Sequence, residues 1–266
     1  MTEPGPDLIL KKRSALIIAG PTASGKSGLA MRIAGDLDGV IINADSQQIY
    51  KGLPILSAQP SFDDFAEIDH RLYSFLDPHE ICDAHRWREL AKIEIETVID
   101  SGKTPILVGG TGLYMNALVD GLSPVPDIPE DIRQRVTNWV EENGTARAFQ
   151  RLRETDPASA GKIDPGNKRR IARALEVLEA TGKSLSGWQK AAKEGAPNDI
   201  IFEMIVVMPD REDLKTRCND RFDWMIEHGA FEEIKTLDSF IKQGRLDDFT
   251  PVTKALGFRP LQAYLN

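Results

Sequence analysis

Hydrophobic and polar residues follow one another in short blocks along this chain, and these blocks predict an α/β fold. Runs rich in Ile, Val and Leu are typical of buried strands in a parallel sheet, and they cover residues 15–19, 40–43, 105–108 and 201–208. A further strand is expected at 71–75. Helical periodicity lies between the strands, at residues 26–38, 83–100 and 111–119. This alternation predicts a parallel sheet flanked by helices.

A different pattern interrupts this core. Residues 123–129 are punctuated by prolines and are expected to form a hinge or linker. Helical patterns then follow without any strand signal, at residues 130–142, 145–154, 167–181 and 184–194. We therefore expect an α/β core whose first part is 1–122, an inserted all-helical subdomain at 123–198, and a return to the core at 199–266.

The first strand is followed directly by Gly-Pro-Thr-Ala-Ser-Gly-Lys-Ser at residues 20–27. This run fits the pattern Gly-x4-Gly-Lys-[Ser/Thr] between a strand and a helix, which indicates a P-loop and a P-loop NTPase-like sheet. Its backbone N–H groups can surround a phosphate, and the following helix N-terminus adds positive charge. The residues expected to bind a di- or triphosphate are Gly20, Thr22, Ala23, Ser24, Gly25, Lys26 and Ser27.

Two members of the P-loop have side-chain roles. Lys26 supplies a point charge to the phosphates, and the Ser27 hydroxyl can ligate Mg²⁺. The alternative is a glycine turn that only packs the strand against the helix, but such a turn does not require Gly-Lys-Ser.

The composition is that of a soluble globular protein. The chain has 266 residues, of which 41% are hydrophobic and 28% charged. Cys82 and Cys218 show no metal or redox spacing. The N-terminal sequence lacks an apolar segment of signal-peptide length, and no run approaches the length of a membrane span. We expect a reduced, cytoplasmic protein that is a monomer and has no membrane segment.

Charge is distributed unevenly. The net charge of −8 argues against a protein coated with basic surface. Between positions 162 and 173, however, basic residues outnumber the single acid, Asp164; they are Lys162, Lys168, Arg169, Arg170 and Arg173. Nucleic-acid contact is therefore expected only through a local patch. Taken alone, Arg169 and Arg173 at i,i+4 are also typical of a solvated helix face.

Asp45 follows the strand at 40–43 and is expected at the edge of the sheet where the P-loop lies. A carboxylate in that position suits a general base or a metal site. The alternative is that Asp45 or Ser46 caps a following helix. The sequence alone leaves both interpretations open.

The strand at 105–108 ends in Gly109-Gly110-Thr111-Gly112, where a motor or switch NTPase would usually carry an acidic Mg²⁺ ligand. The glycines instead suggest a close approach of backbone to substrate. The alternative is a strand-to-helix turn that Thr111 caps.

Arg217 and Arg221 are spaced i,i+4 in a helix after the last strand, and they could reach the crevice as a diphosphate clamp. Alternatively, they pair at the surface with Asp213, Asp220 or Asp223. The four histidines show no metal-ligand spacing. Three tryptophans are expected to contribute to core or subdomain packing, namely Trp139, Trp188 and Trp224.

Taken in order, these segments resemble the tRNA dimethylallyltransferases, also called isopentenyltransferases. The resemblance covers most of the chain. The matching segments include the P-loop, Asp45-Ser46-x-Gln48-x-Tyr50, His70-Arg71-Leu72, Gly109-Gly110-Thr111-Gly112-Leu113-Tyr114, Asp156-Pro157, Arg170-Ile171-x-Arg173-Ala174-Leu175-Glu176-Val177, Thr181-Gly182-Lys183-Ser184, Arg221-Phe222-Asp223-x-Met225 and Ala255-Leu256-Gly257-Phe258-Arg259. Each segment is short, but the ordered set is highly specific.

The resemblance implies transfer of a dimethylallyl group from its diphosphate to the exocyclic amine of the adenine just 3′ of the anticodon in tRNA. It implies Mg²⁺, an anticodon stem-loop as partner and a tRNA-gripping insertion. Asp45, Lys26 and Thr111 become the expected catalytic residues, and Arg221 joins the diphosphate site. The residues expected to contact tRNA are Asp45, Ser46, Gln47, Gln48, Thr111, Arg133, Arg169, Arg170, Arg173, Gly257 and Arg259.

The sequence also departs from the family pattern. Gln59 stands where the family commonly has a lysine, and 165–167 read Pro-Gly-Asn instead of Pro-Asn-Asp. Family members usually continue beyond the position of Asn266 with a basic helical segment, so part of the tRNA channel is expected to be absent from this sequence.

Other functions compete with this one. An isopentenyltransferase acting on free adenine nucleotides shares the P-loop and the chemistry, but it needs no basic helical insertion. A small P-loop kinase would use Asp45 to activate a hydroxyl, but no arginine-rich lid is evident. A non-catalytic RNA-binding module is disfavoured by the intact set of Lys26, Ser27 and Asp45.

Overall fold

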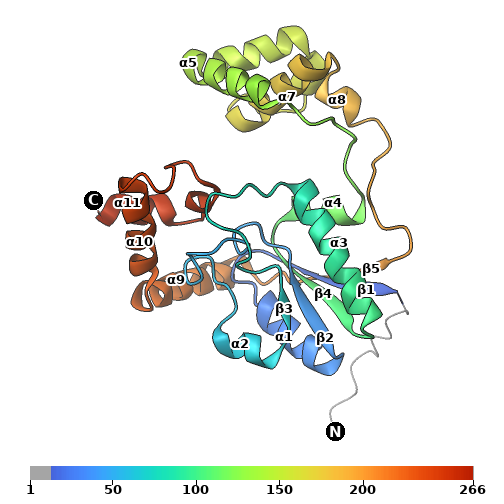
Figure 1. The fold of residues 1–266 in the computed structure, drawn as a ribbon, viewed down its shortest axis with the longest axis vertical. Coiled ribbons are helices and arrows are strands. Elements are labelled where there is room, and N and C mark those ends of the chain that lie inside the picture. The colour runs from blue at the N-terminus through green and yellow to red at the C-terminus, as the bar shows by residue number, and fades with distance from the viewer. Residues whose placement is uncertain (1–12, 266) are drawn as a thin grey trace. The chain divides into compact units, whose positions relative to one another are not determined.

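One parallel sheet organises the first of two compact units (Figure 1). The computed structural model describes residues 13–265, so the expectation about the N-terminal leader falls mostly outside the described residues. The strand order is β3-β2-β4-β1-β5, and every pairing is parallel. The strands are β1 (Ser14–Ala19), β2 (Gly39–Asn43), β3 (His70–Arg71), β4 (Thr104–Gly109) and β5 (Ile201–Val206). The predicted α/β class is confirmed.

Helices cover this sheet because its strands are apolar on both faces. Leu16, Ile18 and Ile106 pack in one cluster with Ala30 and Ala34 of α1. The intervening strand residues point to the other face, and α3 contacts β2 and β4. The helices of this unit are α1 (Lys26–Asp36), α2 (Phe62–Glu67), α3 (Ala84–Asp100), α4 (Gly112–Val119), α9 (Arg211–Glu227), α10 (Ala230–Lys242), the 3₁₀ helix η1 (Pro251–Lys254) and α11 (Phe258–Leu265).

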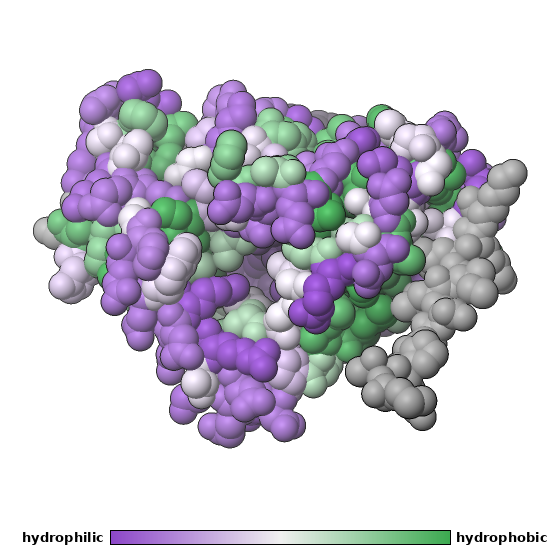
Figure 2. Space-filling view, turned by 90° about the horizontal axis from the view of Figure 1, so that it is seen from below, coloured by the Kyte–Doolittle hydropathy of each residue, from purple (hydrophilic) through white to green (hydrophobic). Residues whose placement is uncertain are grey.

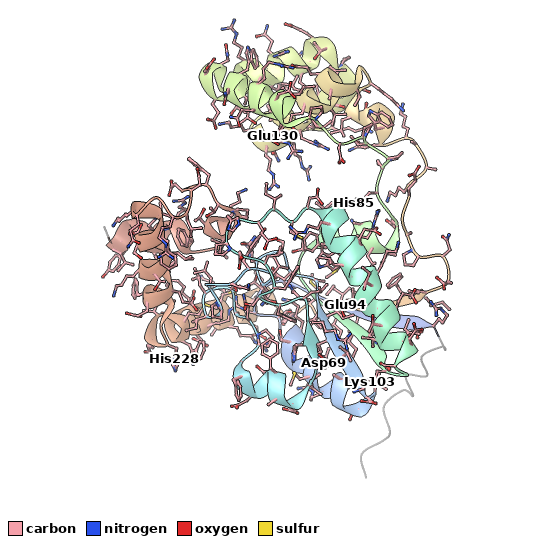
Figure 3. The ribbon with its side chains drawn as sticks, viewed as in Figure 1. Asp69, His85, Glu94, Lys103, Glu130 and His228 are labelled. Atoms are coloured by element: carbon pink, nitrogen blue, oxygen red, sulfur yellow. The ribbon has the colours of Figure 1, made fainter. Side chains whose placement is uncertain are left out.

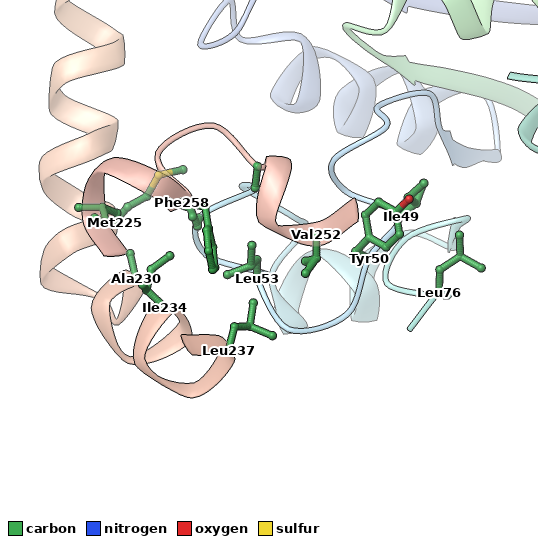
Figure 4. Close-up of a cluster of buried hydrophobic side chains, with 13 residues drawn as sticks. Ile49, Tyr50, Leu53, Leu76, Met225, Ala230, Ile234, Leu237, Val252 and Phe258 are labelled. Atoms are coloured by element: carbon green, nitrogen blue, oxygen red, sulfur yellow. The ribbon is translucent and has the colours of Figure 1, made fainter. Parts of the chain in front are cut away.

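A second apolar cluster joins the C-terminal helices to the loop after β2 (Figure 4). Phe258 of α11 is completely buried, and Leu53 of the loop is 1% exposed. Ile234 and Leu237 supply the buried face of α10. Burial of such side chains contributes about 1.5–3 kcal/mol each. The C-terminal helices therefore anchor the polypeptide that follows Asp45.

Residues Asp120–Ala196 form the second compact unit, which is helical. Its helices are α5 (Glu130–Thr155), α6 (Pro157–Ala160), α7 (Lys168–Thr181) and α8 (Leu185–Trp188). Val136 and Leu152 of α5 pack with Ile171 and Leu175 of α7, which are also buried. The unit thus has an apolar core of its own.

The helices of this unit agree with the prediction in one place and differ from it in another. The two helices expected at 130–142 and 145–154 are the two halves of α5, which is interrupted at Gly144 by a non-helical backbone conformation (φ 77°, ψ 163°). The helix expected at 184–194 ends at Trp188. Beyond it, Glu194 pairs with Leu122 through two backbone hydrogen bonds, so this stretch is used to close the base of the unit.

Two strand predictions are also corrected. The strand expected at 71–75 is limited to β3, because Leu72 (φ 60°) and Ser74 (φ 45°) have left-handed backbone conformations. The strand expected at 201–208 ends at Val206, and it is not buried: Ile201, Met204 and Val206 are 42–55% exposed. It is one of the two edge strands of the sheet and has a single strand, β1, as neighbour.

Hydrophilic side chains cover most of the face shown in Figure 2, with smaller groups of apolar side chains between them. Within residues 13–265, the structure contains no helix that combines the length and the apolar character needed to span a bilayer.

Candidate active site

The P-loop has the backbone geometry of an anion-binding loop. The backbone φ angles of Ala23 (61°) and Gly25 (91°) are positive, while that of Ser24 between them is not. Such alternation turns successive N–H groups toward the same side. Helix α1 begins at Lys26, so its N-terminus points at the same place. This geometry supports the phosphate-binding prediction made for residues 20–27.

The side chains of the loop occupy two environments. Ser24 is 3% exposed, and its Oγ has no hydrogen-bond partner. Gly20 leaves the space for it, because a Cβ on Gly20 would lie 2.8 Å from Ser24 Oγ and 2.6 Å from the Val207 carbonyl. Thr22 and Ser27 are exposed. Ser27 is therefore open to solvent and to any ligand in the loop.

Lys26 lies in a positively charged corner. Its Nζ donates a hydrogen bond to the Pro21 carbonyl at 3.2 Å. Burial lowers the pKa of Lys26; the negative charge of Asp45 acts against this, and the positive charge of Arg221 adds to it. An anion bound in the loop would relieve this unfavourable environment.

Helix α9 brings arginines to the P-loop. Arg217 Nη1 lies 3.7 Å from the position of a Cβ built on Gly25, and Cys218 Sγ contacts the Thr22 carbonyl at 3.9 Å. Within residues 13–265, neither Arg217 nor Arg221 forms an ion pair with the neighbouring aspartates, so the surface-pairing alternative is not observed. Both guanidinium groups remain available to a phosphate.

Asp45 uses its two carboxylate oxygens differently. Oδ1 accepts a hydrogen bond from the Gln47 backbone N–H at 2.9 Å and closes an Asx turn. Oδ2 has no hydrogen bond with any described residue, and it lies 3.9 Å from the position of a Cβ on Gly110. Residues 46–49 form a turn and not a helix, so the alternative in which Asp45 or Ser46 caps a following helix is wrong. Oδ1 therefore stabilises the turn, and Oδ2 is available to a ligand.

Thr111 holds the polypeptide next to Asp45. Its Oγ1 accepts a hydrogen bond from the Ser46 backbone N–H at 3.0 Å and donates one to Ser46 Oγ at 3.3 Å. The Thr111 backbone N–H donates to the Ala44 carbonyl at 3.3 Å. Its hydroxyl therefore does not cap α4, and it joins the carboxyl ends of β2 and β4.

The glycines after β4 serve a backbone-to-backbone approach. A Cβ on Gly109 would lie 2.1 Å from the Ala44 carbonyl oxygen. The close approach anticipated for substrate is thus present at Gly109 between two strand ends. Gly110 has more room, because the nearest atoms to its Cβ position are the Gly20 carbonyl at 3.5 Å and Asp45 Oδ2 at 3.9 Å.

Other predicted residues have internal roles. Gln48 Nε2 donates to the carbonyls of Ser57 and Ala58, which ties the Asp45 turn to the following loop. Gln47 Oε1 is buried without a partner. Arg259 forms an ion pair with Asp248 at 2.7 Å. Gly257 adopts a φ of 90° at the start of α11.

The remaining predicted residues lie in the helical unit. Arg169 and Arg170 are exposed at the N-terminus of α7, and neither forms an ion pair with a described residue. Arg173 contacts Glu176 at 3.4 Å, and Arg133 contacts Glu130 at 3.8 Å. Arg169 and Arg170 are therefore two neighbouring exposed cations of this unit with no ion-pair partner among the described residues.

Aromatic and ionisable residues near the site play supporting roles. Burial, with a smaller effect of the Asp45 charge, raises the pKa of Tyr73, so its hydroxyl stays neutral. Arg71 forms ion pairs with Asp69 and with Glu94, and the second pair fastens β3 to α3. Trp224 is 50% exposed and stacks on His228, so the packing role expected for it is wrong: this face of α9 lies outside the apolar cluster.

Among the described residues, no three Asp, Glu, His or Cys side chains converge as a metal site. His85 in α3 and His228 after α9 lie well apart (Figure 3). A divalent cation here would therefore depend on few protein ligands and on the oxygens of a bound phosphate.

Comparison with known proteins identifies the family. Residues 48–266 match the model of the family described as IPP transferase. The chain belongs to the IPP transferase family. The resemblance stated from the sequence motifs is thereby confirmed.

Two curated relatives of this chain are both named tRNA dimethylallyltransferase. A tRNA dimethylallyltransferase of Paramagnetospirillum magneticum is 47% identical over 251 residues, which are 94% of this chain and 78% of the relative. One from Rhodospirillum centenum is 43% identical and covers 96% of this chain and 80% of the relative.

Solved structures of the IPP transferase family agree with the fold. A crystal structure of a full-length tRNA isopentenylpyrophosphate transferase from Bacillus halodurans has a TM-score of 0.62 at 30% identity, covering 95% of this chain and 77% of that one. A eukaryotic dimethylallyltransferase acting on tRNA has a TM-score of 0.77 at 30% identity, covering 95% and 63%.

Proposed function

We propose that this protein transfers a dimethylallyl group from dimethylallyl diphosphate to the exocyclic amine of the adenine just 3′ of the anticodon in tRNA. One observation carries the proposal: Asp45, with its free carboxylate oxygen, and the P-loop both follow the carboxyl ends of strands, and the charge of Asp45 raises the pKa of Lys26 against the effect of burial. A base and a diphosphate site are thus combined. The names of the relatives supply the two substrates.

The P-loop side of the site would hold the diphosphate. Backbone N–H groups of residues 23–27 and the N-terminus of α1 face this position. As the allylic C–O bond breaks, negative charge grows on the leaving diphosphate, and Lys26, Arg217 and Arg221 stabilise it. Burial lowers the pKa of Lys26 and so disfavours its positive charge, and the negative charge of a bound diphosphate would act in the opposite direction.

The Asp45 side would accept the proton. The new N–C bond forms at the adenine amine, which then loses a proton to Asp45 Oδ2. An adenine amine is a poor nucleophile, so such a base contributes about 10²–10⁴-fold to the rate. The adenine must leave its stack in the RNA to reach this carboxylate. Thr111 acts by holding Ser46 and thereby the turn that carries Asp45.

The residues of the P-loop fit Mg²⁺. Mg²⁺ takes one or two protein oxygens together with phosphate oxygens and water, and the exposed Ser27 hydroxyl is such a donor. Bound there with the diphosphate, Mg²⁺ would add positive charge to the leaving group. Ser27 is the residue that we assign to it.

The helical unit would contact tRNA. Arg169 and Arg170 at the start of α7 carry positive charge that no acidic side chain among the described residues neutralises. Phosphate contacts by such arginines supply affinity and orientation, while an inserted loop base supplies specificity. A free nucleotide would need no such surface, which favours tRNA over the free-nucleotide alternative.

A transfer assay tests the proposal. The protein is incubated with radiolabelled dimethylallyl diphosphate and an anticodon stem-loop, and in parallel with AMP; a further reaction contains γ-labelled ATP and the same RNA. We expect label on the stem-loop alone. Label on AMP would support the free-nucleotide enzyme, and transfer of the γ-phosphate would support a kinase.

A further inference from the structure

Asn43 is a buried polar residue two positions before Asp45, and no motif discussed above includes it. It ends β2, whose other side chains are apolar, and its exposure is 0%. A buried amide destabilises a fold unless its polar atoms are hydrogen-bonded. The hydrogen-bond partners of this amide should therefore indicate what it does in the structure.

The side chain of Asn43 contacts the backbone of Asp45 from both ends of the amide. Oδ1 accepts a hydrogen bond from the Asp45 N–H at 2.8 Å, and Nδ2 donates to the Asp45 carbonyl at 3.0 Å. The amide thus fixes the two peptide groups that flank the Asp45 Cα. The direction of the Cα–Cβ bond, and with it the carboxylate, follows from these two groups.

The amide is itself held on the far side. Nδ2 also donates to the Leu72 carbonyl at 3.0 Å, and the Asn43 carbonyl accepts a hydrogen bond from Trp87 Nε1 at 3.0 Å. Leu72 has a left-handed φ of 60°, so this contact fastens a strained segment. The Asn43 side chain is therefore held by the Leu72 carbonyl, just after β3, while Trp87 of α3 contacts only the Asn43 main chain.

We propose that Asn43 is a positioning residue: it orients the Asp45 carboxylate so that Oδ1 stays in the Asx turn with Gln47 and Oδ2 stays directed toward the acceptor amine. This role rests on the proposed function, because it matters for catalysis only where Asp45 is the base. Its structural part, the orientation of the carboxylate, stands independently of the reaction.

Two variants separate positioning of Asp45 from support of Leu72. Asn43→Ala removes every side-chain contact. Asn43→Ser leaves a hydroxyl that can accept the Asp45 N–H in an ST turn, but it is too short to reach the Leu72 carbonyl. Trp87→Phe is the matched control, since it removes a hydrogen bond to the Asn43 carbonyl and leaves the amide intact.

The assay measures kcat and the KM for dimethylallyl diphosphate with an anticodon stem-loop, together with Tm. We expect Asn43→Ala to lower kcat by about 10–100-fold with KM within threefold of the unchanged protein, because misplacement of a catalytic group by about 1 Å can cost 10²-fold. Asn43→Ser should recover most of kcat despite a lowered Tm. Trp87→Phe should lower Tm and leave kcat unchanged.

Other results overturn the inference. Unchanged kcat in Asn43→Ala does so directly, and so does a parallel loss in all three variants that follows Tm. If Asn43→Ala does not fold, Asn43→Asp replaces it: it keeps the acceptor for the Asp45 N–H but turns an oxygen toward the Asp45 carbonyl, so kcat should again fall at constant KM. Normal kcat in that variant overturns the inference.

A crystal structure of Asn43→Ala, or of Asn43→Asp in its place, distinguishes failure of the inference from failure of the proposed function. If the unchanged protein transfers no dimethylallyl group, the proposed function is wrong. The inference then depends on the distance between Asp45 Oδ1 and the Gln47 nitrogen, which is 2.9 Å here. A lost contact supports positioning by Asn43, and a retained contact refutes it.

Discussion

Replacement of Gly109 by alanine tests whether the two strand ends at the site must touch. The new Cβ would lie 2.1 Å from the Ala44 carbonyl oxygen and 2.2 Å from its carbonyl carbon, whereas ordinary contacts begin at 3.4 Å. Both obstructing atoms belong to the backbone, so no side chain can rotate away. The ends of β2 and β4 must separate by about 1 Å, and Ala44 is bonded directly to Asp45.

The expected consequence is a loss of turnover. A displacement of this size costs about 10²-fold in rate, and overpacking of this kind destabilises a fold by about 1–3 kcal/mol. Gly112→Ala is the matched control, because a Cβ there meets no atom within 4 Å and Gly112 begins α4.

Single-turnover transfer to a stem-loop, thermal unfolding by circular dichroism and calorimetric binding of inorganic pyrophosphate measure the three consequences. We expect lower turnover in Gly109→Ala, with pyrophosphate affinity retained because the P-loop follows a different strand. Turnover within twofold of the unchanged protein would show that Asp45 does not depend on this contact.

Three further predictions address the individual parts of the site. Asp45→Asn keeps an oxygen for the Asx turn but places an NH₂ where Oδ2 lies, so turnover should fall by about 10²–10⁴-fold while stem-loop affinity in a filter-binding assay stays constant; equal turnover would leave Asp45 with the turn alone. Lys26→Met should abolish transfer without lowering Tm at pH 7, because the pKa of Lys26 is lower in the fold than in the unfolded chain and folding therefore disfavours the charged form. The free energy of unfolding of the unchanged protein, relative to that of this variant, should rise with pH between the native and the unfolded pKa of Lys26. A fall in that range would contradict the reasoning. Replacing Arg169, Arg170 and Arg173 together by alanine should reduce the slope of log affinity for the stem-loop against log salt by roughly 0.7–0.9 for each lost phosphate contact, with pyrophosphate affinity unchanged; an unchanged slope would identify these arginines as a solvated helix face.

The sequence was sufficient to predict the sheet and the P-loop because both depend on local patterns. Apolar runs next to a Gly-Lys-Ser motif determine a strand, a turn and a helix start without reference to the rest of the chain. The exposure of β5 could not be predicted in the same way. Its residues are as apolar as those of β1, and only the strand order leaves it with one neighbour.

The candidate site was predictable in its residue types and incompletely so in their tasks. Asp45 and Thr111 were identified, but each accepts a hydrogen bond from a backbone N–H group, and such a partner cannot be identified from the sequence. Asn43 was missed, although one polar residue ending an apolar strand was a usable signal. The contact at Gly109 was anticipated as an approach to substrate, because a glycine indicates lack of space without naming what fills it.

The Asx turn at Asp45 also determines which acid the site accepts. Glutamate has the same acidic group and nearly the same intrinsic pKa, but its extra methylene would move the carboxylate outward and leave the Gln47 N–H without its oxygen. The local backbone thus selects a side-chain length before acidity becomes relevant. A carboxylate held in this way is already ordered when the substrate binds. The loss of side-chain entropy that orients Asp45 therefore occurs during folding and not during the reaction.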